Sequence, residues 1–299
     1  MTLPTFITVG AEKCGTTALH EHLSQHPEIF MSEPKEPSYF VATDSNYTSQ
    51  NMGNLKHGYI DSLKDYQAIF THVSNEKAVG ESSPCYLYSK IAAETIKRQL
   101  PDAKIIIILR NPMRRAFSQY VFNQMRGWES RDINFEQALA REPERIANSS
   151  MWAFHYCARG MYYEQVKRYL DTFGESNVKI LLYDDFASRP QQQLKQVHQF
   201  LSVSQFKLPD AKEKHNVTKL TKNKSLDNMM NSDTAIKQFL KQLLPNSIKQ
   251  QLKTKIMEIN SIKPQVDENM IIELEEVFRD DIKKLNKIVN VNPLIWLSS

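Results

Sequence analysis

Short apolar runs alternate with segments of helical periodicity along the first 200 residues. The runs are Phe6–Val9, Ile29–Met31, Lys77–Glu81, Lys104–Leu109 and Val178–Tyr183. They predict β-strands, and the most apolar of them, with four isoleucines and a leucine in a row, predicts a strand buried on both faces. Helices are predicted near residues 17–25, 61–70, 89–100, 113–125, 135–141, 162–173, 191–201, 235–261 and 267–289. This alternation favours βαβ units, so we expect an α/β fold in three layers, with a mainly parallel central sheet flanked by helices.

The pattern changes over residues 204–234, which are rich in Lys, Asn, Ser and Thr and poor in apolar residues. This composition is typical of a solvated linker, and equally of a basic loop that folds over an anionic ligand. An apolar tail, Leu294–Leu297, follows the last predicted helix. Because no internal repeat is visible, we expect a single domain over residues 1–299, with the basic loop at about 204–234 and a helical part at about 235–299.

Composition narrows the class of protein. Of the 299 residues, 41% are hydrophobic and 24% charged, which excludes a disordered chain. The net charge of +4 suits an anionic ligand but is too small to indicate nucleic acid. No apolar run approaches the roughly 20 residues that cross a bilayer. The three cysteines, Cys14, Cys85 and Cys157, are too far apart for a CxxC metal site, and their odd number suits a reducing compartment. We expect a cytoplasmic protein without a membrane span.

The segment Gly10–Thr17 reads GAEKCGTT and lies between a predicted strand and a predicted helix. That placement gathers backbone N–H groups and a helix N-terminus around one anion. The segment almost matches the phosphate-binding pattern G-x-x-x-x-G-K-[ST], but Thr16 stands where the lysine belongs and the loop carries Lys13 instead. The pattern therefore predicts a P-loop-like anion site that does not demand a metal. A chance glycine-rich turn is the alternative.

A second candidate element begins where the strand Lys104–Leu109 ends. Arg110 directly follows this strand, at the edge where parallel α/β sheets bind ligands. Arg114 and Ser118 are four residues apart and share one face of the next helix. A guanidinium and a hydroxyl at this edge can hold a phosphate. Arg115 is expected on the solvated face of the same helix.

Together these residues resemble a known family. The segments GAEKCGTTAL and IIIILRNPMRRAFSQY are similar to the two cofactor signatures of sulfotransferases that use 3′-phosphoadenosine 5′-phosphosulfate (PAPS). The resemblance continues through KEPSYF, GESSPCYL, RGMYYEQVKRYLDTFGESNVKILLYDDFASRP and LEEVFRDDIKKLNKIVNVNPLIWL, and so covers nearly the whole chain. It is closer to the carbohydrate branch, with heparan sulfate enzymes and bacterial relatives, than to the phenol and steroid branch.

The resemblance implies a cofactor site. The loop residues that would hold the phosphosulfate are Lys13, Cys14, Gly15, Thr16 and Thr17. Lys13 would also be catalytic, by neutralising charge on the bridging oxygen as sulfate leaves. Arg110 and Ser118 would bind the 3′-phosphate, and Lys222 and Lys224 are the nearest counterparts of the family's late basic loop. The ring that stacks on adenine is left open among Tyr86, Trp128 and Tyr162.

The resemblance also implies an acceptor site. Glu36 precedes two residues and an aromatic pair, as the catalytic glutamate of heparan-sulfate-type enzymes does, and it would act as the general base. Tyr39 and Glu81 would bind the acceptor. An ordinary loop carboxylate paired with Lys35 is the alternative for Glu36, and His20, His22 and His26 are alternative bases. One departure is Ser82, which stands where the heparan-sulfate type carries a lysine.

The resemblance thus predicts an O-sulfotransferase. It would move a sulfuryl group from PAPS to a hydroxyl of a carbohydrate or small natural product by in-line transfer, leaving 3′,5′-diphosphoadenosine (PAP), without a required metal. Two alternatives stay open. One is a P-loop kinase or NTPase of a small substrate, and the other is a non-catalytic protein that binds adenosine phosphates.

Overall fold

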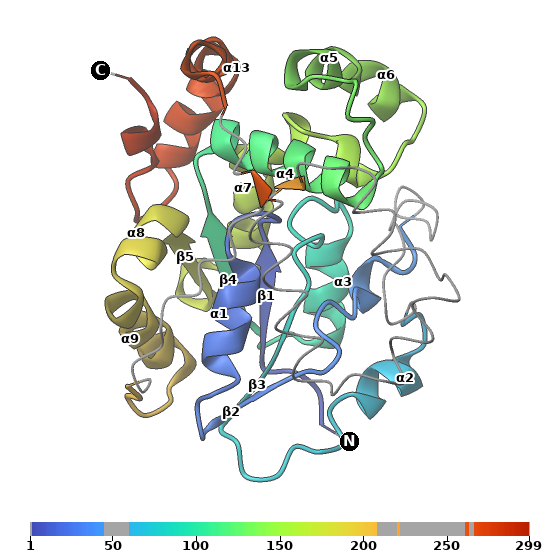
Figure 1. Cartoon of the computed structure of the whole chain (residues 1–299). Helices are drawn as coiled ribbons and strands as arrows, with labels where there is room; N and C mark the ends of the chain where they lie inside the picture. The colour runs from blue at the N-terminus through green and yellow to red at the C-terminus, as the bar shows by residue number, and fades with distance from the viewer. Residues whose placement is uncertain (1, 45–59, 208–219, 222–260, 263–265, 299) are drawn as a thin grey trace, which may run out of the picture.

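The centre of the molecule is a five-stranded sheet in the order β2-β3-β1-β4-β5 (Figure 1). A computed structural model of the chain describes residues 2–44, 60–207, 220–221, 261–262 and 266–298. Every pair of neighbouring strands in this sheet is parallel. The strands are β1 (Phe6–Gly10), β2 (Ile29–Met31), β3 (Ala78–Ser82), β4 (Lys104–Leu109) and β5 (Val178–Leu182). The predicted α/β class and parallel sheet are confirmed.

Helices cover both faces of the sheet and its carboxyl edge (Figure 1). One face carries α1 (Thr16–Leu23), α8 (Tyr183–Ser188) and α9 (Pro190–Leu201). The other carries α3 (Ala92–Gln99) and α7 (Tyr162–Phe173). Across the carboxyl edge lie α4 (Pro112–Arg126) and α13 (Glu268–Asn286). The shorter helices are α2 (Leu63–Ala68), α5 (Phe135–Ala140) and α6 (Glu142–Ala147). Two helical layers around one sheet confirm the predicted three-layer arrangement.

The inner strands β3, β1 and β4 are buried along nearly all of their length. Ile105, Ile106, Ile107 and Ile108 of β4 are fully buried, as a continuous apolar run on an inner strand requires. The register of β1 against β4 slips between Thr8 and Gly10. Such a bulge bends a strand and ends regular pairing. It therefore turns the chain out of the sheet at the point where the segment Gly10–Thr17 begins.

The loops that leave β1 and β4 run apart. After β1 the chain crosses toward β2 and β3, whereas after β4 it crosses toward β5 on the other side. In open parallel sheets, ligands bind in the crevice that such divergence leaves at the carboxyl edge. The segment Gly10–Thr17 follows β1 and Arg110 follows β4, so the fold brings both predicted anion-binding elements to this crevice.

The structure departs from the predicted elements in a few places. The helices α6 and α8 were not predicted, because each is a single short helical stretch without a clear apolar stripe. Most of the predicted basic loop at 204–234 and nearly all of the predicted helix at 235–261 lie outside the described residues.

Among the helices that the structure describes, none is both long and apolar enough to span a bilayer.

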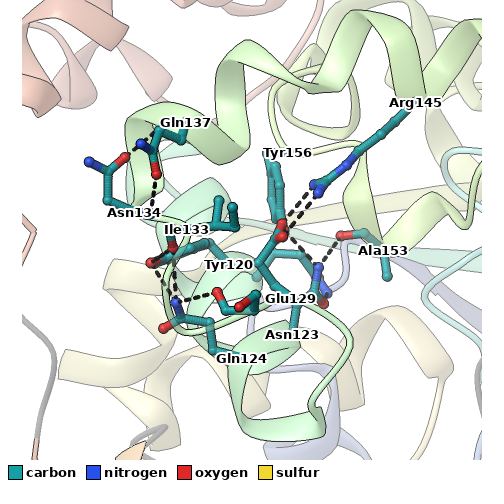
Figure 2. A network of polar contacts seen from close by, with 12 residues as sticks. Tyr120, Asn123, Gln124, Glu129, Ile133, Asn134, Gln137, Arg145, Ala153 and Tyr156 are labelled. Carbon is teal, nitrogen blue, oxygen red and sulfur yellow. Dashed lines mark hydrogen bonds and ion pairs between the residues drawn. The ribbon is translucent and has the colours of Figure 1, made fainter.

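A buried polar network ties α4 to the segment that follows it (Figure 2). Arg145 donates two hydrogen bonds to Glu129, at 2.7 and 2.9 Å, and the Tyr156 hydroxyl donates a third at 2.9 Å. Asn123 on α4 donates to Tyr156 Oη at 3.0 Å and to the Ala153 carbonyl at 2.8 Å. Burial alone would raise the pKa of Glu129, but the hydrogen bonds and charge of Arg145 outweigh it and leave that pKa below its usual range.

Breaking this network from one side is expected to be costly. Arg145→Met leaves the Glu129 carboxylate, 3% exposed, without its ion pair, so the free energy of unfolding should fall by about 3–5 kcal/mol in chemical denaturation. The pKa of Glu129 lies below its usual value in the folded state. Its stabilisation is therefore present at neutral pH and is lost as the pH falls.

Two further variants test the cause. Adding Glu129→Gln to Arg145→Met should recover most of the loss, because the neutral amide can keep its bond to Tyr156. Lys167→Met, which removes an exposed ion pair with Asp171, should leave unfolding nearly unchanged. Equal losses in the Arg145 and Lys167 variants would contradict the assignment.

Candidate functional site at the carboxyl edge of the sheet

The segment Gly10–Thr17, here called the glycine loop, is anchored to the sheet and then enters α1. The Ala11 N–H donates to the Ile108 carbonyl at 2.8 Å, which fixes the loop to β4. Gly15 precedes the helix with φ +90°, and a Cβ at this position would lie 2.9 Å from the Tyr183 ring. Thr16 is buried and Thr17 is exposed. The loop therefore has one shape that only glycine allows at position 15.

Unusual backbone conformations concentrate around this loop. Among the described residues other than glycine, positive φ angles occur at Lys13 (66°), Glu36 (66°), Ser38 (55°), Ser149 and Ser202. The first three lie at the carboxyl edge of the sheet, and two of them are the predicted catalytic residues. Strained conformations of this kind persist only where the surrounding structure enforces them, and they cluster at functional sites.

Arg110 joins the end of β4 to the glycine loop. Its Nη1 donates to the Lys13 carbonyl at 3.2 Å, and its guanidinium lies 4.9 Å from the centre of the Tyr183 ring. The Tyr162 hydroxyl donates to the Arg110 carbonyl at 3.0 Å, so the main chain is held as well. Ser118 is half-buried on α4, two turns further along the chain. The structure thus places Arg110 beside the glycine loop.

Lys13 carries a charge that its surroundings make unstable. Its Nζ lies 3.9 Å from the centre of the Phe122 ring of α4. Burial lowers the pKa of Lys13 to about 8, against the opposing effect of the Glu12 and Glu36 carboxylates. The Lys13 side chain is therefore mostly protonated at neutral pH and loses its proton readily at higher pH.

Two buried arginines lie beneath the glycine loop, and the sequence did not predict either of them there. Arg159, 4% exposed, pairs with Glu12 of the loop. Arg115 was expected on a solvated helix face, which is wrong: it is fully buried, and its Nη2 donates to the Tyr156 carbonyl. Because α4 covers the sheet edge while residues 152–160 cover α4, position 115 points inward. Its Nε and Nη1 have no partner among the described residues.

The turn that carries Glu36 is pinned to the end of β3. The Glu36 N–H donates to the Ser82 carbonyl at 3.1 Å, and the Ser38 N–H donates to Ser83 Oγ at 3.1 Å. The Glu36 side chain is 39% exposed and pairs with Lys35, the contact that an ordinary loop carboxylate would also make. Glu36 is nevertheless close enough to Lys13 to raise the pKa of that lysine. The Glu36 carboxylate is therefore within electrostatic reach of the Lys13 ammonium.

Glu81 lies below this turn rather than at the surface. It is fully buried and accepts hydrogen bonds from Tyr66 Oη at 3.0 Å, Ser83 Oγ at 2.7 Å and Tyr86 Oη at 2.9 Å. Burial raises the pKa of Glu81 to about 7, in opposition to these bonds. The predicted acceptor-binding partner Tyr39 is half-buried and stacks on Tyr66, with ring centres 4.4 Å apart. Glu81 is thus turned inward and holds Ser83, which in turn holds the Glu36 turn.

The three histidines named as alternative bases have different surroundings. His20 Nδ1 lies 3.0 Å from Ser82 Oγ at the edge of the site, and burial lowers its pKa to about 4. His22 packs edge-on against Phe186. His26 uses both ring nitrogens, accepting from the Glu28 N–H and meeting the Ser204 carbonyl. Of the three, only His20 borders the site.

The remaining predicted residues divide between core and surface. Cys14 is buried, with its Sγ 3.7 Å from Tyr162 Oη. Tyr86 and Tyr162 are fully buried and their hydroxyls are engaged, so of the rings considered for adenine only Trp128 is partly exposed. Lys222 and Lys224 lie outside the described residues, although the two-residue strand β6 (Leu220–Thr221) just before them packs against α4. In the described part of the chain, no group of three or more His, Cys, Asp or Glu side chains is placed to hold a metal.

Comparison with known proteins identifies the family. A family model described as a sulfotransferase domain matches residues 3–288, so the chain belongs to the sulfotransferase family. The crystal structure of a sulfotransferase from Alicyclobacillus acidocaldarius superposes with a TM-score of 0.77 and 30% identity over 99% of both chains. This membership favours the sulfotransferase interpretation over the P-loop kinase alternative.

Two curated relatives match over part of their length. The membrane-associated sulfotransferase kil1 of Dictyostelium discoideum is 32% identical over 158 residues, 53% of this chain and 30% of the relative. The human bifunctional heparan sulfate N-deacetylase/N-sulfotransferase 2 is 27% identical over 205 residues, 68% of this chain and 22% of the relative. The chain thus spans less than a third of either relative.

The conformation of the glycine loop predicts that a side chain at position 15 destabilises the fold. In Gly15→Ala, a Cβ would be forced against the Tyr183 ring at φ +90°, so the free energy of unfolding should fall by about 1–3 kcal/mol in chemical denaturation. Gly127→Ala is the matched control, because φ is +71° there but the space around the Cβ is open. Adding Tyr183→Leu to Gly15→Ala should recover part of the loss. A smaller loss for Gly15→Ala than for Gly127→Ala would show that the loop is not fixed as described.

Proposed function

We propose that this chain transfers a sulfuryl group from PAPS to an acceptor hydroxyl, with Glu36 as general base and Lys13 as the cation at the leaving oxygen. The observation that carries the proposal is that Lys13 and Glu36 both lie at the carboxyl edge of the sheet, Lys13 after β1 and Glu36 against the end of β3. Each is held by an unusual backbone conformation, and they are close enough to interact electrostatically. Family membership supports the same reaction.

The side chains around the crevice fit an anionic nucleotide. The glycine loop offers its backbone N–H groups and the hydroxyls of Thr16 and Thr17 to the phosphosulfate, and Cys14 and Gly15 shape the loop. Arg110 is half-buried beside the loop, and Ser118 follows on α4, so these two would hold the 3′-phosphate. Lys222 and Lys224, which follow β6 in the chain, would add positive charge to the same site. β6 itself lies against α4.

When bound, the phosphosulfate supplies the sulfuryl group and a phosphate leaving group. Glu36 takes the proton of the acceptor hydroxyl as the acceptor oxygen forms a bond to sulfur. Lys13 stabilises the negative charge that remains on the bridging oxygen when its bond to sulfur breaks. Because the pKa of Lys13 is about 8, kcat/KM, which reports the ionisation of the free enzyme, should decline as the pH rises through this value. None of these residues requires a metal to act.

The acceptor class follows from the family rather than from the site. We propose a carbohydrate or a small natural product, with Tyr39 at the acceptor side and Glu81 as a positioning residue beneath it. One relative is named as a heparan sulfate N-sulfotransferase, so acceptors with amino groups belong in the test panel beside hydroxyl acceptors. We further propose that residues 1–299 form a single sulfotransferase domain and that the protein is cytoplasmic.

Nucleotide binding tests the first half of the proposal. Calorimetry should show tight binding of PAP and much weaker binding of 5′-AMP, because Arg110 and Ser118 act on the 3′-phosphate. Arg110→Ala should weaken PAP binding by roughly tenfold or more, since a charge-assisted contact contributes about 1.5–3 kcal/mol. The same variant should bind 5′-AMP almost as the parent does. Equal affinities of the parent for PAP and 5′-AMP would refute the cofactor assignment.

Turnover tests the second half. With ³⁵S-labelled PAPS and an acceptor panel, Glu36→Gln should bind PAP normally but lose about 10²–10⁴-fold in kcat, because an amide cannot accept the proton. His20→Ala is the matched comparison, since His20 borders the same site. Near-full activity in Glu36→Gln with loss in His20→Ala would make the histidine the base. Tight PAP binding without transfer to any acceptor would favour the non-catalytic alternative.

A further inference from the structure

Phe122 of α4 lies between cationic side chains at the edge of the site. The Lys13 Nζ is 3.9 Å from the centre of its ring, and the Arg126 guanidinium is 5.1 Å from it. The Trp128 ring meets Phe122 edge-on, with ring centres 5.9 Å apart and an interplanar angle of 81°. An ammonium within about 6 Å of an aromatic face is attracted by the ring quadrupole, and the attraction grows as water is excluded.

The position of Phe122 is not explained by core packing. Phe117, the other half-buried phenylalanine of α4, packs against the hydrophobic core and against Phe135. Phe122 is not among the described residues that pack against this core, and its ring faces the two cations and Trp128 instead. Phe122 is also four residues after Ser118, so it shares the helix face that is directed to the cofactor in the proposed function.

The other charges around Lys13 do not replace the ring. Glu12 and Glu36 favour its charged form, whereas Arg110, Arg115 and burial oppose it. Glu12 is already paired with Arg159, and Glu36 with Lys35, so neither carboxylate is committed to Lys13. Among the described residues, the Phe122 face is the direct contact of the Lys13 ammonium, and it costs the ammonium little to leave.

We propose that Phe122 is a positioning residue that holds the Lys13 ammonium, charged and against α4, until the sulfuryl donor arrives. This inference rests on the proposed function, in which Lys13 stabilises the leaving oxygen. A neutral ring suits the task, because a carboxylate in the same place would bind the ammonium in competition with the donor phosphate. Substitutions that keep an aromatic face should therefore preserve the behaviour of Lys13, and aliphatic ones should not.

The ionisation of Lys13 reports this contact directly. Competitive labelling of lysines with acetic anhydride over a range of pH, read by mass spectrometry, gives the pKa of Lys13 without nucleotide or acceptor. In Phe122→Leu it should fall by about 0.4–1.5 from its value near 8, the equivalent of the lost ring–ammonium attraction. Phe122→Tyr should leave it within about 0.3, because tyrosine keeps the aromatic face. Phe117→Leu, the same change on the same helix, should also leave it in place.

Each outcome decides the matter. An unchanged or raised pKa of Lys13 in Phe122→Leu, or an equal fall in Phe117→Leu, overturns the inference. PAP affinity at pH 6.5 within about threefold of the parent checks that the site is intact. If Phe122→Leu does not fold, Phe122→Met provides the same aliphatic comparison. Turnover of Lys13→Ala separates the two proposals: full activity there refutes the role of Lys13 in transfer, whereas the labelling result concerns Phe122 alone.

Discussion

The structure depends on the parallel pairing of β1 with β4. These two strands send their following loops in opposite directions, and the hydrogen bond from Ala11 to the Ile108 carbonyl fixes the first loop to the second strand. The glycine loop and Arg110 therefore reach the same crevice although about a hundred residues separate them. A change that shifted β4 along β1 would move the Arg110 guanidinium away from the Lys13 carbonyl and separate the two candidate anion-binding elements.

The site also depends on charges that never reach its surface. Arg159 and Arg115 lie beneath the glycine loop, and Glu81 lies beneath the turn of Glu36. Buried ionic groups of this kind contribute little net stability compared with apolar side chains, but they fix the groups above them in one arrangement. The catalytic candidates Lys13 and Glu36 are partly buried, while the charged residues beneath them are inside.

The sequence was sufficient for the parts that follow a repeating pattern. The five strands, the loop at Gly10 and the placement of Arg110 could all be predicted from apolar runs and from the residues that end them. The inward position of Arg115 could not, because Arg115, Gln119 and Asn123 form a polar stripe four residues apart, which periodicity alone assigns to solvent. Arg159 and Phe122 gave no local signal at all, since their partners Glu12 and Lys13 lie more than a hundred residues away in the chain.

The thiol of Cys14 has a consequence of its own. It is fully buried within the glycine loop, against Tyr162 Oη of α7, and burial raises its pKa. A thiol in this state is inert toward alkylating reagents for as long as the loop and α7 stay in contact. The rate at which Cys14 is alkylated therefore reports how often the glycine loop separates from α7.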